Sequence, residues 1–206
     1  MKLVVLGATG GTGLEIIRQA IGRGHSVTAL VRSPERLNGF ASSGRIGVIQ
    51  GDLLNVSELK RVIEGQDAVL SAFGSHEDDV GVWRRFAVAL TDAMAQTGVR
   101  RVAVLSVAFL FKDSIIPPAF LAGRLFFPKT VMGASQMEEV FVESGLDWTI
   151  VRPPRLTDKP YTGRYRVKED HLPPLGFTIS RADVADFIIK AVENRSSIPK
   201  IVGVCN

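Results

Sequence analysis

The fold is decided by residues 2–13, which read KLVVLGATGGTG. A strand is expected over residues 2–6, because the four residues after Lys2 are all apolar, which is typical of a strand buried on both faces of a sheet. A turn with spaced glycines follows. Residues 12–23 then have the spacing of an amphipathic helix, with apolar side chains on one face at Leu14, Ile17 and Ile21. A strand, a glycine-rich turn and a helix in this order predict the first half of a βαβ unit.

Three glycines of the turn stand at positions where the predicted structure requires a residue without a side chain. Gly7 permits a tight turn off the strand, Gly10 lets the backbone approach a diphosphate, and Gly13 lets the helix pack closely on the sheet. The first turn of the helix also offers free N–H groups and a partial positive charge. The pattern therefore predicts a dinucleotide-binding turn made of Gly7, Thr9, Gly10, Gly11, Thr12 and Gly13.

The rest of the chain continues this alternation. Strands are expected at residues 26–31, 45–50, 67–73, 101–107, 147–151 and 200–204, and helices at 56–63, 83–96, 130–143 and 181–193. Ser180, three residues before Asp183, predicts a capping box at the start of the last helix. The order predicts an α/β fold, a Rossmann-type doubly wound parallel sheet. We expect one such domain over residues 1–206, with little or no separate substrate domain.

Two long stretches, residues 108–128 and 153–180, are expected to be irregular. Both follow strands, so both should emerge at the carboxyl edge of the sheet, where such folds bind ligands. Residues 109–128 are strongly apolar. The simplest interpretation is core packing against the last helix. The open alternatives are a pocket wall, a lid, a dimer patch and a membrane-surface contact. We favour a pocket wall or a lid.

The end of the second strand indicates which dinucleotide is bound. An acidic residue there would hold the ribose 2′-hydroxyl of NAD, whereas a cation accommodates the 2′-phosphate of NADP. The sequence has Arg32 at this point and Arg36 one helical turn later, and Ser33 adds a hydroxyl. We therefore expect NADP, in its reduced form NADPH, rather than NAD.

Two further strand ends are expected to contact the dinucleotide. Asp52, followed by Leu53, comes after the third strand and is placed to meet the adenine; a turn or capping role is the equal alternative. Ala72, Phe73 and Gly74 end the fourth strand and should pass beside the dinucleotide.

Several blocks resemble a known family. Four of them are the GATGGTG turn, Leu30-Val31-Arg32, Gly51-Asp52 and the WTIVRP stretch at 148–153. Together they resemble the atypical short-chain dehydrogenase/reductase group. Within that group the chain is similar to the branch of NmrA-like proteins and of biliverdin reductase B, also called flavin reductase. The blocks that carry this similarity, in order and spacing, are Ser106 with Ala108-Phe109-Leu110, Pro117-Pro118, and Pro153-Pro154 followed by Tyr161-Thr162-Gly163.

The resemblance, which covers nearly the whole chain, implies an NADPH-dependent reductase that acts on a flavin, a tetrapyrrole or a quinone-like acceptor. It also implies that Pro153 lies beside the cofactor and that Ser106 faces the nicotinamide, where it is the candidate catalytic residue. A buried serine bonded to the backbone is the alternative for Ser106. The biliverdin reductase B type has a histidine soon after the Pro-Pro pair, where this sequence has Arg155. A fixed cation there favours an anionic acceptor, although a surface arginine is an equal alternative.

The sequence departs from most short-chain reductases in one respect. These enzymes use a Tyr-x-x-x-Lys pair for proton transfer, but the corresponding positions fall near Thr130 and Ala134. Neither Tyr161 nor Tyr165 has a lysine four residues on. Hydride transfer to a conjugated acceptor needs less proton chemistry from the protein, so a reductase is favoured. A non-catalytic, redox-sensing NADP-binding regulator of the NmrA type remains the alternative, and a nucleotide-sugar epimerase is disfavoured.

Composition limits the other classes. The net charge is +4 and the basic residues are scattered, so we expect no nucleic-acid binding. Cys205 is the only cysteine, and the three histidines form no ligand pattern, so we expect no disulfide and no metal. The first apolar run is too short for a signal segment or a membrane span. We therefore expect a cytoplasmic monomer or homodimer that contacts no membrane.

Overall fold

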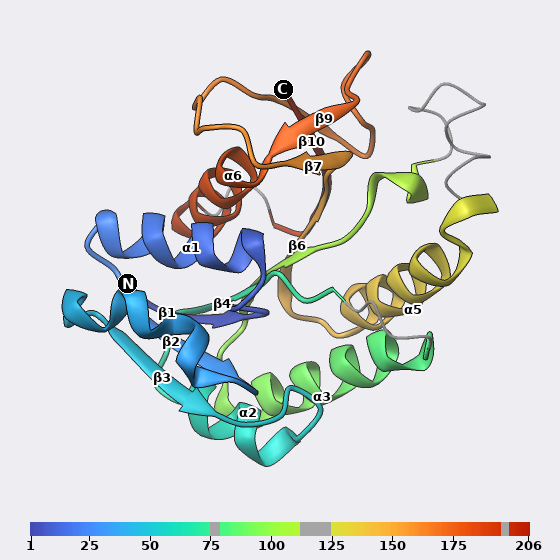
Figure 1. Ribbon diagram of the computed structural model, residues 1–206. Coiled ribbons are helices and arrows are strands. Elements are labelled where there is room, and N and C mark those ends of the chain that lie inside the picture. The colour runs from blue at the N-terminus through green and yellow to red at the C-terminus, as the bar shows by residue number, and fades with distance from the viewer. Residues whose placement is uncertain (75–78, 112–124, 195–197) are drawn as a thin grey trace.

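The computed structural model describes residues 1–74, 79–111, 125–194 and 198–206. Among these residues eight strands form one sheet, in the order β3-β2-β1-β4-β5-β6-β10-β8, and β7 pairs with β9 separately (Figure 1). The main-sheet strands are β1 (Lys2–Leu6), β2 (Ser26–Val31), β3 (Ile46–Gln50), β4 (Ala68–Ser71), β5 (Arg101–Leu105), β6 (Asp147–Arg152), β8 (Arg166–Glu169) and β10 (Lys200–Cys205). The small pair is β7 (Arg155–Thr157) and β9 (Thr178–Ser180).

The main sheet is parallel from β3 to β10, and only the edge strand β8 runs antiparallel, against β10. Leu6 lies opposite Leu30 on β2 and opposite Ser71 on β4. The strands therefore end together at one carboxyl edge. Chain order reverses between β1 and β4, which is the switch point where doubly wound sheets bind their ligands. The predicted Rossmann-type parallel sheet is confirmed.

Helices cover both faces of the sheet (Figure 1). On one face lie α1 (Gly11–Gly22) and α6 (Arg181–Glu193), together with the 3-10 helix η1 (Pro34–Ser43). On the other face lie α2 (Val56–Ile63), α3 (Gly81–Thr97) and α5 (Pro128–Glu143). Each layer buries its own apolar cluster against the sheet, because the strands have apolar side chains on both faces.

One prediction about the chain's organisation is wrong. Residues 153–180 were expected to be irregular but contain β7, β8 and β9. β7 and β9 have only three residues each, and all four residues of β8 are exposed. Segments so short, or so evenly exposed, carry no hydrophobic periodicity from which a strand could be predicted.

The predicted N-cap at Ser180 is confirmed, but the capping box is not reciprocal, because the backbone N–H of Ser180 donates to Asn206 Oδ1 at 2.9 Å and not to Asp183. Ser180 Oγ accepts a hydrogen bond of 3.0 Å from the backbone N–H of Asp183, the third residue of α6. Ser180 is itself buried and closes β9, so the same residue ends the small strand pair and begins the last helix. The start of α6 is thereby fixed in position.

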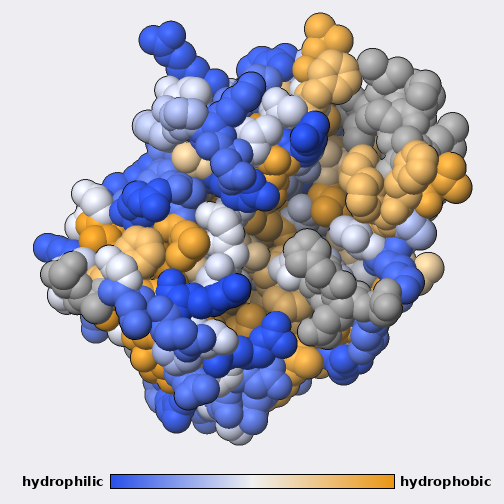
Figure 2. Space-filling model, viewed as in Figure 1, coloured by the Kyte–Doolittle hydropathy of each residue, from blue (hydrophilic) through white to orange (hydrophobic). Residues whose placement is uncertain are grey.

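The apolar stretch 109–128 is described only at its two ends, and residues 112–124 lie outside the described residues. Phe111 is buried near Ala108, Leu172 and Cys205, and 3-10 helix η2 (Ala108–Leu110) precedes it. The other end, Leu125, Phe126 and Phe127, is strongly exposed. Figure 2 shows this apolar surface at the start of α5. Core packing against the last helix is therefore wrong for these three residues.

Candidate functional site

The glycine turn is packed against the end of β4. Gly7 has a φ of +71°, and a Cβ atom on it would lie 2.6 Å from the carbonyl carbon of Ala72. A Cβ atom on Gly13 would lie 2.2 Å from the carbonyl oxygen of Gly7. Both positions therefore exclude any side chain, as the sequence predicted for a tight turn and a closely packed helix. The turn and Ala72 meet at the switch point of the sheet.

The first turn of α1 has the features of an anion site. Gly10 is the N-cap residue and has no side chain with which to satisfy the first N–H groups of the helix. Residues 11–14 carry no charge, so the positive end of the helix is not neutralised by its own first turn. Gly10 and Gly11 are exposed, whereas Thr12 is buried. The backbone and charge of this turn fit the diphosphate of a dinucleotide.

Arg32 and Arg36 are both exposed next to this edge. Arg32 directly follows β2, and its carbonyl oxygen accepts a hydrogen bond of 3.3 Å from Gln50 Nε2 at the end of β3. Arg36 lies in η1, which begins two residues after Arg32 with Ser33 as its N-cap. The two cations thus sit on the β2 side of the glycine turn, the side predicted for the 2′-phosphate.

Asp52 takes part in the turn that follows β3. Its Oδ1 accepts a hydrogen bond of 3.0 Å from the N–H of Leu54, and its own N–H donates to Glu58 Oε2 at 2.6 Å. This is the turn role weighed as the alternative to adenine binding. The Asp52 side chain is exposed, while Leu53 packs on the core beneath α2 and α3.

The side chain of Phe73 points away from the dinucleotide turn. Its ring stacks on Phe86 with centroids 4.2 Å apart and meets Trp83 edge-on at 5.5 Å, both in α3. Only the backbone of Phe73 borders the glycine turn, where its nitrogen lies 2.8 Å from a Cβ built on Gly7. β4 ends at Ser71, two residues earlier than predicted, because its pairing with β1 and β5 ends there.

Ser106 lies in a buried polar cluster that it shares with two residues not predicted from the sequence. Its hydroxyl donates to Glu138 Oε1 of α5. Glu138 also accepts hydrogen bonds from Arg152, at 2.9 Å from Nε and 2.5 Å from Nη2. Arg152 closes β6, and its guanidinium lies 4.7 Å from the centroid of the Phe111 ring. The cluster joins the ends of β5 and β6 to α5 at the carboxyl edge.

A sequence signal for Glu138 did exist. Ala134, Met137 and Phe141 form the buried stripe of α5, and Glu138 falls inside that stripe. A charged residue on the apolar face of a helix requires a partner, because an unpaired buried charge is costly. Arg152, at the end of a buried strand, is that partner.

The remaining positions considered in the sequence fall in three places: beside Ser106, on β7 and on α5. Pro153 is buried, and its carbonyl oxygen accepts a hydrogen bond of 3.0 Å from Ala108, so it lies close to Ser106. Arg155 is exposed on β7, which pairs with β9 and not with the main sheet. The positions considered for a Tyr-x-x-x-Lys pair, Thr130 and Ala134, lie on α5, where Ala134 is fully buried.

The two tyrosines are held by α6. Tyr165 donates a hydrogen bond of 2.6 Å to Asp186, and Tyr161 donates one of 3.4 Å. Burial raises the pKa of the Tyr165 phenol, and the hydrogen bond to Asp186 raises it further. Burial alone would raise the pKa of Asp186, but hydrogen bonds from Lys190 and Tyr165 outweigh it and lower that pKa. The Tyr165 phenol therefore stays protonated at neutral pH.

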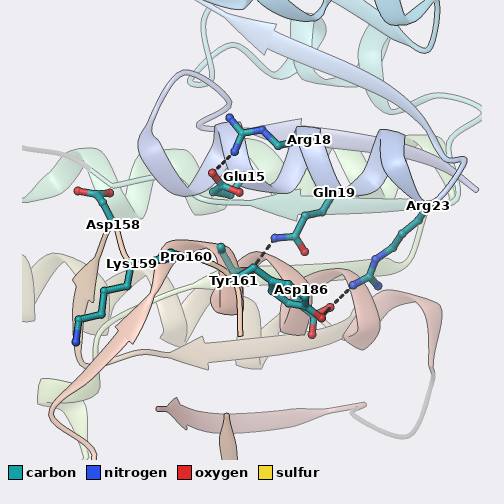
Figure 3. A pocket seen from close by; sticks show the side chains of 10 residues that line it. Glu15, Arg18, Gln19, Arg23, Asp158, Lys159, Pro160, Tyr161 and Asp186 are labelled. Carbon is teal, nitrogen blue, oxygen red and sulfur yellow. Dashed lines mark hydrogen bonds and ion pairs between the residues drawn. The ribbon is translucent and has the colours of Figure 1, made fainter. Parts of the chain in front are cut away.

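A groove of about 540 Å³ runs between α1, α6 and residues 158–161. Figure 3 shows Arg23 reaching Asp186 at one end of it, with Asp158 at the other end. None of its ten lining residues was predicted for the cofactor site.

Within the described residues, no group of three or more His, Cys, Asp or Glu side chains could hold a metal ion, and no helix is long and apolar enough to span a membrane.

Comparison with known proteins identifies the family. The NAD(P)H-binding family model matches residues 7–195. An uncharacterized chloroplast protein of Arabidopsis thaliana is 31% identical over 212 residues, covering 98% of this chain and 75% of that protein. The photosystem II assembly factor Ycf39 of Synechocystis sp. is 24% identical over 207 residues; 94% of this chain is covered, but only 59% of that protein's length. The chain therefore belongs to the NAD(P)H-binding family.

Solved structures share the same fold. A Burkholderia pseudomallei protein described as exported has a TM-score of 0.81 at 26% identity, with both chains covered in full. ChuY, an anaerobilin reductase from Escherichia coli O157:H7, has a TM-score of 0.83 at 20% identity over 100% of this chain and 97% of its own. A Veillonella parvula short-chain dehydrogenase/reductase solved with NADP has a TM-score of 0.83 at 20% identity, over 100% of this chain and 94% of its own. At 20% identity the likeness shows the fold alone.

Proposed function

We propose that this protein is an NADPH-dependent reductase that transfers hydride to a flat conjugated acceptor such as a flavin, a tetrapyrrole or a quinone. The observation that carries the proposal is the glycine turn, whose Cβ-free backbone lies at the switch point of the sheet beside the end of β4. Membership of the NAD(P)H-binding family supports the cofactor class. When bound, the dinucleotide supplies the hydride.

The residues proposed to hold the dinucleotide follow the strand ends. The first turn of α1 binds the diphosphate, and Arg32 and Arg36 bind the 2′-phosphate of NADPH. The known NADP complex of the Veillonella protein supports NADP as the cofactor. The full proposed set is Gly7, Thr9, Gly10, Gly11, Thr12, Gly13, Arg32, Arg36, Asp52, Leu53, Ala72, Phe73, Gly74, Ser106 and Pro153, with Phe73 acting through its backbone.

The acceptor is proposed to bind beyond Ser106. The hydroxyl of Ser106 donates its hydrogen bond to Glu138. The lone pairs of Ser106 Oγ can therefore accept a hydrogen bond from a donor group on the nicotinamide or on the substrate. Arg155 adds a cation for anionic groups of the acceptor. A conjugated acceptor can take its proton from solvent, which agrees with the lack of a Tyr-x-x-x-Lys pair in the sequence. One structural neighbour is described as an anaerobilin reductase, which supports a reductase role.

The experiment that tests the reductase is NADPH oxidation, followed as the loss of reduced-nicotinamide absorbance. FMN, a linear tetrapyrrole and a small quinone serve as acceptors, and NADH is the matched control for the 2′-phosphate. The proposal predicts turnover with at least one acceptor and a preference for NADPH. NADPH that binds but is oxidised with none of the three would contradict the reductase.

A second candidate is a non-catalytic NADP-binding regulator. Two observations favour it: the sequence lacks the Tyr-x-x-x-Lys pair, and one relative is named an assembly factor. This candidate predicts dinucleotide binding without turnover and a difference in affinity between NADPH and NADP⁺. Parallel titrations with the two redox forms separate it from the reductase.

A further inference from the structure

Arg181 lies directly against the glycine turn. A Cβ atom built on Gly11, the first residue of α1, would be 2.8 Å from Arg181 Cδ and 2.9 Å from its Nε. The arginine side chain therefore passes over the backbone at the positive end of α1. A residue larger than glycine at position 11 would displace this side chain.

The position of Arg181 is fixed by its surroundings. It is the first residue of α6, directly after the capping residue Ser180. The next residue, Ala182, accepts a hydrogen bond of 2.7 Å at its carbonyl oxygen from Gln19 Nε2 of α1. The start of α6 is thus attached to α1, and the Arg181 side chain is held beside the glycine turn.

The guanidinium of Arg181 has a weakly held partner. Its Nη1 lies 2.6 Å from Asp158 Oδ1, and the Asp158 side chain is 88% exposed. Exposed ion pairs contribute little to stability, since water screens them and ordering two side chains costs entropy. A diphosphate carries two negative charges and several acceptor oxygens, so it is a stronger partner for an arginine than one exposed carboxylate.

We infer that Arg181 is a diphosphate-binding residue and that Asp158 competes with the dinucleotide for it. In the free protein Asp158 holds the guanidinium beside the turn; on binding, the guanidinium exchanges this carboxylate for the diphosphate. Arg181 therefore raises affinity for the dinucleotide and Asp158 lowers it. This inference rests on the proposed binding of NADPH and adds a residue and a competing charge to that site.

The test is a fluorescence titration that gives the Kd of NADPH for two variants. Arg181→Gln is expected to weaken binding about tenfold, the loss of one charge-assisted contact. Arg18→Gln is the matched control, because it removes an exposed α1 arginine that pairs with Glu15, and it should leave the Kd unchanged. Asp158→Asn is expected to tighten binding about threefold, since the competing charge is gone.

Three controls sharpen the result. Glu169→Gln removes another exposed acid from an ion pair, at the far edge of the sheet, and should not tighten binding. Asp158→Asn should have no further effect in the Arg181→Gln background. 2′-AMP has no diphosphate, so its Kd should be unchanged by Arg181→Gln. Thermal melting checks that Arg181→Gln folds; Asp158→Asn changes an exposed side chain and tests the inference by itself.

The outcomes separate the two claims. Opposite shifts of the Kd for the two variants support the inference. NADPH binding by the wild type with an unchanged Kd in Arg181→Gln, or with weaker binding in Asp158→Asn, would overturn the inference while leaving the proposed function standing. No NADPH binding by the wild-type protein would overturn both.

Discussion

Glu138 of α5 and Arg152 at the end of β6 are joined by two hydrogen bonds, of 2.9 and 2.5 Å, at the carboxyl edge of the sheet. Both side chains are largely removed from solvent, at 6% and 13% exposure. The same Glu138 oxygen that accepts from Arg152 Nε also accepts from Ser106. One buried carboxylate therefore sets the orientation of the residue proposed to face the nicotinamide.

The first prediction concerns the stability of this cluster. Glu138→Ala should lower the free energy of unfolding by about 3 kcal/mol, because it leaves the Arg152 charge buried without its partner. Urea denaturation measures the change. Glu139→Ala, one residue along on the exposed face of α5, is the matched control and should change the free energy by less than about 0.5 kcal/mol. Equal effects of the two substitutions would contradict this account of the cluster.

The second prediction separates binding from catalysis at Ser106. Ser106→Ala should lower kcat for acceptor reduction about tenfold or more, since it removes a positioned polar group from the reacting centre. The Kd of NADPH, most of whose proposed contacts lie elsewhere, should stay within about twofold of the wild-type value. Steady-state kinetics and a binding titration give the two quantities. An unchanged kcat would exclude Ser106 from the reaction.

The third prediction concerns the glycine turn itself. Gly13→Ala should cost about 2 kcal/mol of stability and weaken NADPH binding, because the added Cβ would lie 2.2 Å from the Gly7 carbonyl oxygen. Gly22→Ala, in the same helix, is the control: a Cβ there meets no atom within 4 Å. That change should be neutral or stabilise by up to about 1 kcal/mol. Thermal melting with and without NADPH reports both effects.

The fourth prediction is an acid-dependent loss of stability through Asp186. Since its pKa in the folded protein lies below the ordinary value of 3.8, the unfolded chain binds more protons. The contribution of Asp186 is therefore complete above pH 3.8 and is lost as the pH falls through the lower, folded value. Unfolding free energies measured from about pH 6 to about pH 2 should fall less steeply in Asp186→Asn than in the wild type. An equally steep fall of the unfolding free energy in the two proteins would contradict this role of Asp186.

Much of the fold could be predicted because the buried strands carry their own signal. The bounds of β1, β2, α2 and α6 agree with the predicted ranges, since each has a continuous apolar run or a clear helical stripe. The small strands between 153 and 180 could not be predicted, because long-range pairing and not local pattern makes them strands.

Residues of the candidate site could be predicted where the backbone at a single position requires a glycine. Pairs of side chains from distant parts of the chain were harder to predict. Gly7 and Gly13 showed their roles in the sequence. Ser106 was named, but its partner Glu138 follows it by 32 positions, and Arg152, which bonds to Glu138, follows it by 46. Only folding brings the three residues together. Arg181 and Gly11 lie still farther apart in the sequence, and no sequence motif predicts their contact.

The glycine turn and the cations beside β2 are proposed to bind NADPH together. The most direct measurement is a titration of the wild type and of Arg32→Ala with NADPH and NADH. The wild type is expected to bind NADPH at least about tenfold more tightly than NADH, and the variant is expected to lose this preference while its affinity for NADH is unchanged. Equal affinity of the wild type for the two dinucleotides, or an unchanged preference in the variant, would contradict this proposal.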